Sequence, residues 1–417
     1  MKYCRRCLYP ENHPLGLTFD SNGICSGCLI HEEKDQLDWD SKRKRLEEIL
    51  SEYRSTSGKV YDCIIPVSGG RDSYFIVDLI KNEFRMNPLL VTYNKHYNTK
   101  VGIRNLAYLR TLFDCDLVMK MVSAKTVKKL TKHTLGVMGS MYWHCLAGQT
   151  VYPIETAVRL RSPLIIWGAH QGVDQVGMFS HEDEVEMTRK YRKDHDLMGW
   201  EAEDLISEED RISEEDVMPF IYPHDKDLER IGIRGIYLNN FIRWDTKAQH
   251  EKMIERFNYK TAKQIRTFDS YNDVDCVHYS GLHDYIKEIK WGYGKVVDHA
   301  TRELRLRRLN RKDAILRTRG FSGVDSLPSD SEVFFEWLGI GKSDFHFIID
   351  GFRDHKLWMK DGPEGWVRRS KAYEFCENQD EFSLGNISQE CGFTSNEEKN
   401  QTASISSYTT FGKGHTD

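Results

Sequence analysis

Long hydrophobic runs are absent from this sequence of 417 residues. No stretch reaches the roughly 18 consecutive apolar residues that a membrane-spanning helix needs, so neither a membrane span nor a membrane partner is expected. Residues 1–7 also lack the apolar segment of a signal peptide, and the protein is therefore expected to be cytoplasmic. Its ten cysteines are then expected to be thiols or metal ligands rather than disulfides.

An excess of basic residues is absent as well. The chain has 59 Lys and Arg residues against 64 Asp and Glu residues, which gives a net charge of −5. Proteins dedicated to nucleic-acid binding usually carry a clustered basic excess, so nucleic acid is not an expected partner. The length is sufficient for two or three domains with a sizeable core.

Short apolar segments alternate with helical patterns from residue 59 to residue 180. The apolar segments predict strands at 60–67, 88–93, 117–122 and 163–167, with a further one at 235–242. Helices are expected at 74–84, at 99–113 and in the segment that ends at 161. Strands that alternate with helices form a parallel sheet covered on both faces, so the predicted fold class is α/β. A ligand is expected beyond the carboxyl ends of the strands.

The most informative segment follows the first expected strand and reads Ser68-Gly69-Gly70-Arg71-Asp72-Ser73. Two glycines allow a tight turn and the close approach of a ligand. The helix that follows offers unpaired N–H groups and the positive end of its dipole to an anion. The pattern predicts a loop that binds a phosphate chain, and a plain strand–turn–helix connection is the alternative. The segment lacks the Gly-Lys-Ser/Thr of the Walker loop, and no GxGxxG follows the strand, so a dinucleotide fold is disfavoured.

Two cysteine pairs near the N-terminus have the spacing of a metal site: Cys4-x-x-Cys7 and Cys25-x-x-Cys28. Four thiolates can meet tetrahedrally on Zn²⁺, and such a closed shell is structural rather than catalytic because no position is left open. Two independent thiol pairs or a redox motif are the alternatives. A redox motif needs one pair in a thioredoxin-like setting, not two pairs at ribbon spacing.

Composition divides the chain into four expected parts. These are a zinc-ribbon knob at 1–31, an α/β domain at 32–180 that begins with an amphipathic helix at 32–54, a mainly helical substrate- or partner-binding region at 181–375, and a polar tail at 376–417. The tail is rich in Ser, Thr, Asn, Glu and Gly and is predicted to be mobile.

Two charged segments stand out in the third part. The sequence Ile-Ser-Glu-Glu-Asp occurs at 206–210 and again at 212–216, and it predicts either two serine-capped helix starts or a solvated acidic face. Six basic residues lie within 302–312. They predict either a basic helix that faces an anion or an ordinary surface helix.

Taken together, these motifs resemble the N-acetyl sugar amidotransferases of the PP-loop ATPase superfamily, which act in bacterial surface-sugar biosynthesis. SGGxDS is the signature of PP-loop ATPases, which cleave ATP between the α and β phosphates. The resemblance runs from residue 1 to about residue 375 and also rests on Trp143-His144-Cys145, Trp167–Gly172, Tyr237-Leu238, Trp244-Asp245, Gly292–Lys295 and Asp298–Ala300. Segment 170–177 looks like the branch that amidinates pseudaminic acid, in lipopolysaccharide or flagellin glycan biosynthesis. Other PP-loop groups often carry an acid or paired aspartates near the fourth strand, where this chain has Ala169 and a single aspartate, Asp174.

The resemblance implies an AMP-forming enzyme with a fold like that of the adenine nucleotide alpha hydrolases. Such an enzyme converts an N-acetyl group to an acetamidino group through an adenylated amide (an imidate), which ammonia then attacks. ATP and Mg²⁺ are the implied cofactors besides Zn²⁺. The implied ATP-binding residues are Ser68, Gly69, Gly70, Arg71, Asp72, Ser73, Gly168 and Lys295, and the implied catalytic candidates are Asp72, Cys145, His170, Asp298 and His299. A structural role is the alternative for each histidine, and a surface cation is the alternative for Lys295 and Arg302.

The expected partners follow from the same reaction. The chain has no Gly-x-Cys-x-Gly nucleophile motif and no cysteine at position 2, so ammonia is expected from a separate glutaminase with an ammonia-channelling subunit. A tRNA-thiolating PP-loop enzyme is the alternative function, and Cys145 would be its sulfur-handling residue. A non-catalytic zinc-ribbon scaffold that binds a nucleotide is the third reading.

Overall fold

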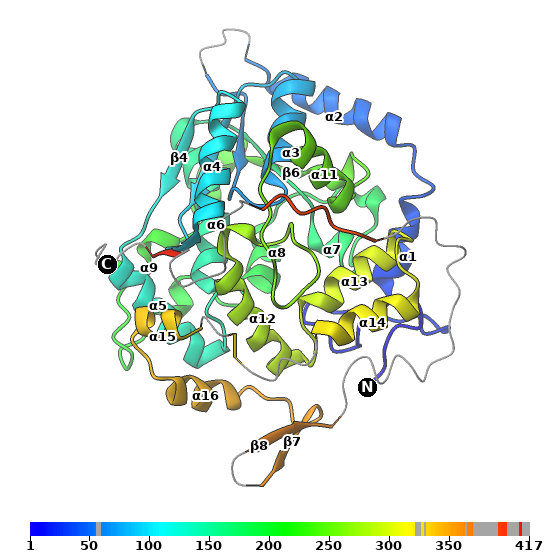
Figure 1. Cartoon of the computed structure of the whole chain (residues 1–417). Coiled ribbons are helices and arrows are strands. Elements are labelled where there is room, and N and C mark those ends of the chain that lie inside the picture. Colours follow the sequence, from blue (N-terminus) through cyan, green and yellow to red (C-terminus); the bar gives the residue numbers. More distant parts are fainter. Residues whose placement is uncertain are drawn as a thin grey trace.

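A central sheet of five parallel strands organises the chain (Figure 1). The computed structural model describes residues 1–55, 60–321, 327–328, 331–362, 365–369, 391–397 and 408–410. The strand order is β4-β2-β1-β5-β6, and each neighbouring pair is parallel. The strands are β1 Cys63–Pro66, β2 Pro88–Tyr93, β4 Leu117–Lys120, β5 Leu164–Trp167 and β6 Arg234–Tyr237. The predicted α/β class is confirmed, and the sheet continues beyond residue 180 because β6 pairs with β5.

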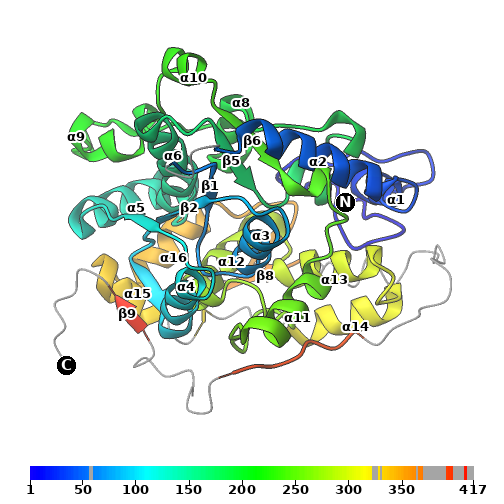
Figure 2. The same ribbon diagram turned by 90° about the horizontal axis from the view of Figure 1, so that it is seen from above.

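Alternating side chains of the strands explain why helices cover both faces. On β1, Ile64 packs with residues of α6 on one face, while Cys63 and Ile65 pack with residues of α2, α3 and α4 on the other. Figure 2 shows α6 on one side of the sheet and α3 and α4 on the opposite side. The covering helices are α2 Trp39–Tyr53, α3 Ser73–Val77, α4 Lys100–Leu112, α5 Ala124–Met138, α6 Trp143–Leu160 and α11 Thr246–Phe257.

Two predicted helices have different bounds for local reasons. The helix expected at 32–54 begins only at Trp39, because the Asp38 side chain accepts hydrogen bonds from the N–H groups of Asp40 and Ser41 and caps it there. The helix expected at 74–84 begins at Ser73 and changes to wider π-type turns at Asp78–Glu83. Shorter helices join β5 to β6: α7 Gln171–Asp174, α8 Arg189–Tyr191, α9 Glu214–Val217 and α10 Asp225–Ile231.

The N-terminal segment packs against helices from the far end of the chain. Its four cysteines share a core with apolar residues of α13 and α14, including Val296, Ala300 and Ala314. Figure 1 shows this contact, with α1 close to α13. The helices involved are α1 Ser26–Glu33, α13 Lys295–Arg305 and α14 Arg311–Phe321.

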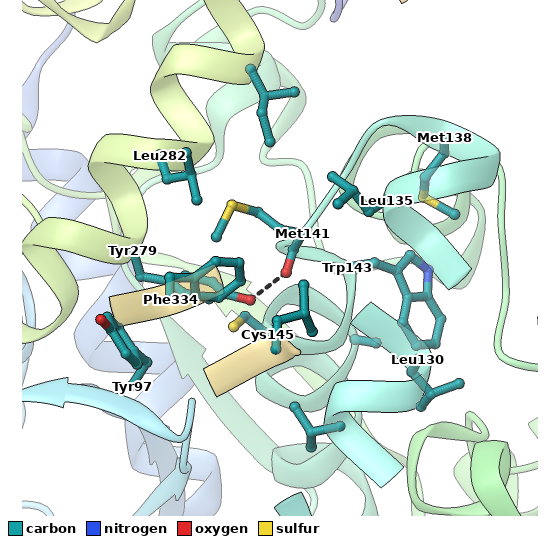
Figure 3. Packing of buried hydrophobic residues seen from close by; sticks show 14 of the residues in the cluster. Tyr97, Leu130, Leu135, Met138, Met141, Trp143, Cys145, Tyr279, Leu282 and Phe334 are labelled. Carbon is teal, nitrogen blue, oxygen red and sulfur yellow. Dashed lines mark hydrogen bonds between the residues drawn. The ribbon is translucent and has the colours of Figure 1, made fainter. Parts of the chain in front are cut away.

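A second core joins helices of the C-terminal region to α5 and α6. Figure 3 shows Cys145 inside it, beside Tyr279 and Phe334, with the Tyr279 hydroxyl donating to the backbone oxygen of Met141. The helices are α12 Val277–Trp291, α15 Ser331–Leu338 and α16 Lys342–Asp350, followed by an antiparallel hairpin of β7 Trp358–Asp361 and β8 Gly365–Arg368. The predicted helical character of the C-terminal region is confirmed.

The charged segments correct two expectations. Only the second acidic repeat starts a helix, at α9, where Ser213 and Asp216 form a capping box. The first repeat is a turn closed by the bridge between Ser207 and Ile212. The basic segment is not one continuous helix, because α13 ends at Arg305. Its Arg307 and Lys312 are exposed, but the arginines at 302, 305, 308 and 311 face the interior, where carboxylates, carbonyls and a thiol accept their hydrogen bonds.

The tail expected to be mobile at 376–417 lies mostly outside the described residues. Two short parts of it are described. In residues 391–397, Phe393 packs against Tyr271, and Asn396 donates to the Tyr259 carbonyl. Strand β9 Tyr408–Thr410 pairs antiparallel with β3 Tyr97–Thr99. Among the described residues, no helix combines the length and the apolar character that crossing a membrane would require.

Candidate functional site

The loop at 68–73 connects the carboxyl end of β1 to α3 and is held by its own hydroxyl groups. The N–H of Ser68 donates to Ser73 Oγ at 3.1 Å, and the N–H of Gly70 donates to Ser68 Oγ at 3.0 Å. Gly69 has φ +76°, and a Cβ atom there would lie 2.9 Å from the backbone nitrogen of Leu106. Glycine at this position is therefore required both by the conformation and by the approach of α4.

Residues of this loop line two cavities. The first, called the apolar cavity here, has a volume of about 340 Å³ and lies between α4 and the ends of β2 and β4. Ser68 lines it, and its apolar wall consists of Ile103, Leu106, Ala107, Leu117, Met119 and Met121. These aliphatic and thioether side chains, together with the volume, suit a largely apolar ligand group.

The second, called the polar cavity, has a volume of about 380 Å³ and is lined by Arg71 and Asp72 of the same loop. The rest of its wall comes from segments far apart in the sequence: Tyr9, Lys34, Asp174, Trp244, Asp273, Lys295, Asp298 and Arg305. The loop is therefore shared by the two cavities, with Ser68 facing one and Asp72 facing the other.

Segment 269–276 also contributes residues to both cavities. Asp275 lines the apolar cavity, and its Oδ2 is 2.6 Å from Lys95 Nζ, in a buried ion pair. A Cβ atom at Gly70 would lie 3.3 Å from Asp275 Oδ1, so this carboxylate stands beside the glycines of the loop. Asp273 lines the polar cavity and has φ +46°, a left-handed conformation that Asp adopts more readily than most residues.

A network of buried charges underlies the polar cavity. Asp269 is fully buried, and its Oδ2 accepts from Arg302 Nη2 at 2.8 Å and lies 4.0 Å from Arg71 Nη1. Burial alone would raise the pKa of Asp269, but the charges of Arg302 and Arg71 outweigh it and hold the pKa well below its usual range. Burial lowers the pKa of His299 to about 3, so this imidazole is neutral at pH 7.

Asp72 has partners on two sides. His250 Nε2 is 3.1 Å from Asp72 Oδ1, and Arg71 Nε is 3.8 Å from Asp72 Oδ2. Burial raises the pKa of Asp72, but Arg71 and the hydrogen bond from His250 outweigh this effect and leave the pKa lowered. Asp72 is therefore a carboxylate at neutral pH, with part of its side chain exposed to the polar cavity.

Other polar groups are fixed around the same cavity. Lys295 Nζ donates to Ser280 Oγ at 3.1 Å and lies 3.8 Å from Asp273 Oδ2. Asp298 forms an ion pair with Lys287 and also accepts from Gln175 Nε2 at 3.2 Å. These groups offer hydrogen-bond donors and acceptors of both charges, which suits a polar ligand with several hydroxyl groups better than a polyanion.

The structure brings most of the predicted site residues together. Lys295, Asp298 and His299 line the polar cavity with Arg71 and Asp72. Gly69, Gly70 and Ser73 form the loop between the cavities. Gly168 lies behind the polar cavity, where a Cβ atom would contact Ile76 and Trp244, and the neighbouring Ala169 lines it.

Two predicted catalytic residues lie apart from both cavities. Cys145 is buried in the helical core beside His144, and burial raises the pKa of its thiol well above the usual value, which opposes formation of a thiolate. His170 is enclosed by aromatic rings, with its ring centre 4.1 Å from that of Tyr191 and 4.6 Å from that of Tyr237. These surroundings favour structural roles for both residues.

The four N-terminal cysteines form a group that could hold a metal ion. All four are buried, and their sulfur atoms lie within 4.8 Å of one another, with Cys7 and Cys25 at 3.6 Å and Cys4 and Cys28 at 4.0 Å. A tetrahedral zinc site with Zn–S bonds of about 2.3 Å places its sulfur atoms about 3.8 Å apart, so this donor set fits Zn²⁺.

The neighbours of the cysteine group also suit a negatively charged tetrathiolate. The N–H groups of Arg6, Cys7 and Cys25 point at Cys4 Sγ from 3.3–3.4 Å. Arg305 Nη2 lies 3.6 Å from Cys25 Sγ, and its Nη1 donates to the carbonyl of Gln175 at 2.7 Å. Arg305 therefore links the cysteine group to the wall of the polar cavity.

Several residues of the site were not predicted from the sequence. These are His250, Asp269, Asp273, Asp275 and Lys95. Three aspartates lie within residues 269–275, and this cluster of acids was a signal in the sequence that could have indicated a functional segment. His250 gave no signal, since it lies in an ordinary amphipathic helix and meets Asp72 only through tertiary packing.

A model of a known protein family matches the part of the chain that supplies several residues of this site. Residues 251–373 match the model of the C-terminal domain of WbpG-like LPS biosynthesis proteins. This region supplies Asp273, Lys295, Asp298, His299 and Arg302 to the polar cavity. The match supports a sugar-modifying biosynthesis family and suggests that the chain is an enzyme of that kind.

A relative has also been found for a shorter stretch. Over 116 residues the chain is 30% identical to the uncharacterized protein MJ1599 of Methanocaldococcus jannaschii. The stretch is 28% of this chain and 41% of that protein, so the similarity spans less than half of either one.

Proposed function

We propose that this protein is an ATP-dependent amidotransferase of the PP-loop superfamily, which converts an N-acetyl group of a bacterial surface sugar to an acetamidino group. The observation that carries the proposal is the position of the loop at 68–73 between two cavities of different chemistry. The match of residues 251–373 to an LPS biosynthesis domain supports a sugar as the substrate.

In this proposal the apolar cavity receives the adenosine part of ATP. Apolar side chains such as Ile103, Leu106 and Met119 would cover the base, and the phosphate chain would run along Ser68, Gly69 and Gly70. The loop ends at the positive pole of α3, which favours a phosphate group there. The α-phosphorus would then stand at the boundary of the polar cavity, where the sugar binds.

The reaction needs the amide oxygen to become a leaving group. In the first step the acetamido oxygen attacks the α-phosphorus, the bond between the α and β phosphates breaks, and pyrophosphate leaves. The amide nitrogen loses its proton, so the product is an adenylated imidate. In the second step ammonia adds to the imidate carbon and AMP departs, which leaves the amidine. The polar cavity must therefore stabilise negative charge on phosphate and also take up protons.

The residues of the polar cavity have properties suited to these steps. Arg71 and Lys295 are cations that can approach the phosphates or an acidic group of the sugar. His299 lines the same cavity as a neutral imidazole, which can form a hydrogen bond with the substrate. Asp72 is the residue that would hold Mg²⁺, which, when bound, would neutralise charge on the departing pyrophosphate.

Ammonia is proposed to come from a separate glutaminase through a channelling subunit. The purified chain should then form product with ammonium salts and none with glutamine alone. Full glutamine-dependent activity of the chain alone would contradict a separate source. The tRNA-thiolating alternative depends on a reactive cysteine, and Cys145 lines neither cavity.

A direct experiment tests the proposal. The protein is incubated with ATP, Mg²⁺, ammonium and a panel of N-acetylated sugars, and the products are analysed by mass spectrometry. We expect AMP to form only with the true substrate, together with a sugar lighter by one mass unit because NH replaces O. Formation of ADP, or AMP formation without any change in sugar mass, would contradict the proposed reaction.

A further inference from the structure

His250 stands behind the loop without lining either cavity. It lies on α11, its side chain is completely buried, and its Nε2 is 3.1 Å from Asp72 Oδ1. The carboxylate of Asp72 faces the polar cavity, with Arg71 near its other oxygen. A buried side chain thus contacts the one acidic residue of the loop from the side opposite to the cavity.

The contact itself shows which group donates. A carboxylate can only accept a hydrogen bond, so Nε2 of His250 is the donor and Asp72 Oδ1 is the acceptor. Nδ1 is buried and has no hydrogen-bond partner among the described residues, so within them Asp72 is the group that holds the ring by a hydrogen bond.

Aromatic residues fix the orientation of the ring. The ring of Tyr259 stacks on His250 at an interplanar angle of 28°, and Tyr271 meets it edge-on, with the ring centres 5.8 Å apart. These neighbouring rings and the complete burial of the side chain favour the orientation in which Nε2–H is directed at Asp72 Oδ1. The position of Asp72 Oδ1 is fixed in turn, and Oδ2 is left for contacts on the cavity side.

We propose that His250 is a positioning residue that holds the Asp72 carboxylate in the orientation needed to bind a divalent cation with the phosphates of ATP. This inference rests on the proposed function and adds to it a residue that never touches the ligand. Hydrogen-bond partners of metal ligands commonly change metal affinity or activity by about 10–100-fold when they are removed.

The test measures metal affinity directly. Mn²⁺ is titrated by calorimetry into the full-length protein in the presence of an ATP analogue with a methylene group between the α and β phosphorus atoms, which prevents cleavage. We expect His250→Leu to weaken Mn²⁺ binding by about tenfold or more. His250→Gln, whose amide nitrogen can reach the position of Nε2, should keep the affinity within about threefold of the unmodified protein.

A matched control separates positioning from packing. His133 on α5 also forms a pair with an aspartate, Asp210, at 2.8 Å, and it lies away from both cavities. His133→Leu should leave the Mn²⁺ affinity unchanged. The thermal unfolding midpoint of each variant shows whether it is folded, and if His250→Leu is not, His250→Asn, which is too short to reach Asp72, replaces it.

The outcomes distinguish the inference from the proposed function. If the unmodified protein fails to bind Mn²⁺ with the analogue, the nucleotide site itself is wrong and the inference fails with it. If the unmodified protein binds and folded variants that lack the Nε2–H group bind equally well, the proposed function stands and the role of His250 is refuted. Weakening by Leu with recovery by Gln supports the inference.

Discussion

The apolar and polar cavities share one loop but are assembled in different ways. The apolar cavity is built almost entirely from residues 68–121, a continuous run of strands and helices, with Asp275 added from outside. The polar cavity takes its wall from positions between Tyr9 and Leu306. The difference teaches that the apolar cavity is formed by residues close together in the sequence, while the polar cavity depends on how distant segments pack.

Metal removal is expected to produce the largest difference between the two cavities. Cys25→Ser should abolish metal binding and loosen Tyr9 and Arg305, which line only the polar cavity. Structural zinc contributes about 10–16 kcal/mol in small zinc domains, so the N-terminal segment should lose its order. Metal content by atomic absorption should fall from one ion per chain to none, and sugar-dependent AMP formation should disappear.

Cys115→Ser is the control for this variant. Cys115 is half-buried and lies outside the cysteine group. It should retain full metal content and activity. Full metal content in Cys25→Ser would contradict the assignment of the site, and normal sugar-dependent activity without metal would contradict the coupling to the polar cavity.

Asp72→Asn should affect chemistry more than nucleotide binding. The adenosine part of ATP is proposed to bind in the apolar cavity, so affinity for the nucleotide should change little, while loss of the carboxylate should slow AMP formation by about 10²–10³-fold. Steady-state kinetics gives both quantities. Asp40→Asn, an exposed acid in the first turn of α2, is the control and should behave normally. Unchanged AMP release in Asp72→Asn would refute its role.

Asp269→Asn tests the buried charges beneath the polar cavity. Removing this carboxylate takes away one of the two ion-pair partners of Arg302 and leaves only Glu303, which should lower the free energy of unfolding by about 3 kcal/mol. Asp35→Asn breaks exposed pairs with Arg243 and Arg307 and should lower it by less than about 1 kcal/mol. Chemical denaturation measures both values, and equal effects would contradict the importance of burial.

Acid should lower the free energy of unfolding through two histidines that line the polar cavity. Burial lowers the pKa of His299 to about 3 and that of His283 to about 4, below the value of 6.5 of an exposed histidine. Below pH 6.5 the unfolded state therefore binds more protons than the folded state. The contribution of these neutral histidines to stability is fully present above pH 6.5 and is lost as the pH decreases. Each histidine should contribute a loss of about 1.4 kcal/mol per pH unit until its folded pKa is reached. Replacing His283 by Gln should reduce the slope measured by denaturation between pH 6.5 and 4.

The smallest expected effect is that of Cys145→Ala. Cys145 lies in the helical core and in neither cavity, so AMP formation should stay within about twofold of the unmodified protein. Stability should fall by about 1 kcal/mol because the buried sulfur is lost. Loss of activity in a folded variant would show that this thiol is needed for the reaction and would favour the tRNA-thiolating alternative.

Local patterns explain what the sequence could predict. The strand expected at 88–93 has these same bounds because a run of buried apolar residues ends at polar ones, and the loop at 68–73 occupies the expected strand end. The cysteine spacing identified a donor set that fits zinc. Each of these features is determined by residues close together in the chain.

The remaining parts of the site depend on long-range contacts. His250 meets Asp72 across 178 positions of the sequence, and Arg305 approaches Cys25 across 280. The arginines at 302–311 look like a surface stripe in the sequence because their partners, such as Asp269 and the carbonyl of Cys4, are distant along the chain. The spacing of residues along one helix cannot predict contacts between residues that are so far apart in the sequence.

The central claim is that the loop between the cavities joins AMP to the amide oxygen of the substrate. Its most direct test uses the substrate sugar identified by mass spectrometry, with a heavy-oxygen label in the acetyl carbonyl. The account predicts that the label appears in the phosphate group of the released AMP and that the amidine product carries none. Unlabelled AMP formed together with amidine would contradict it, because the amide oxygen would then have left by another route.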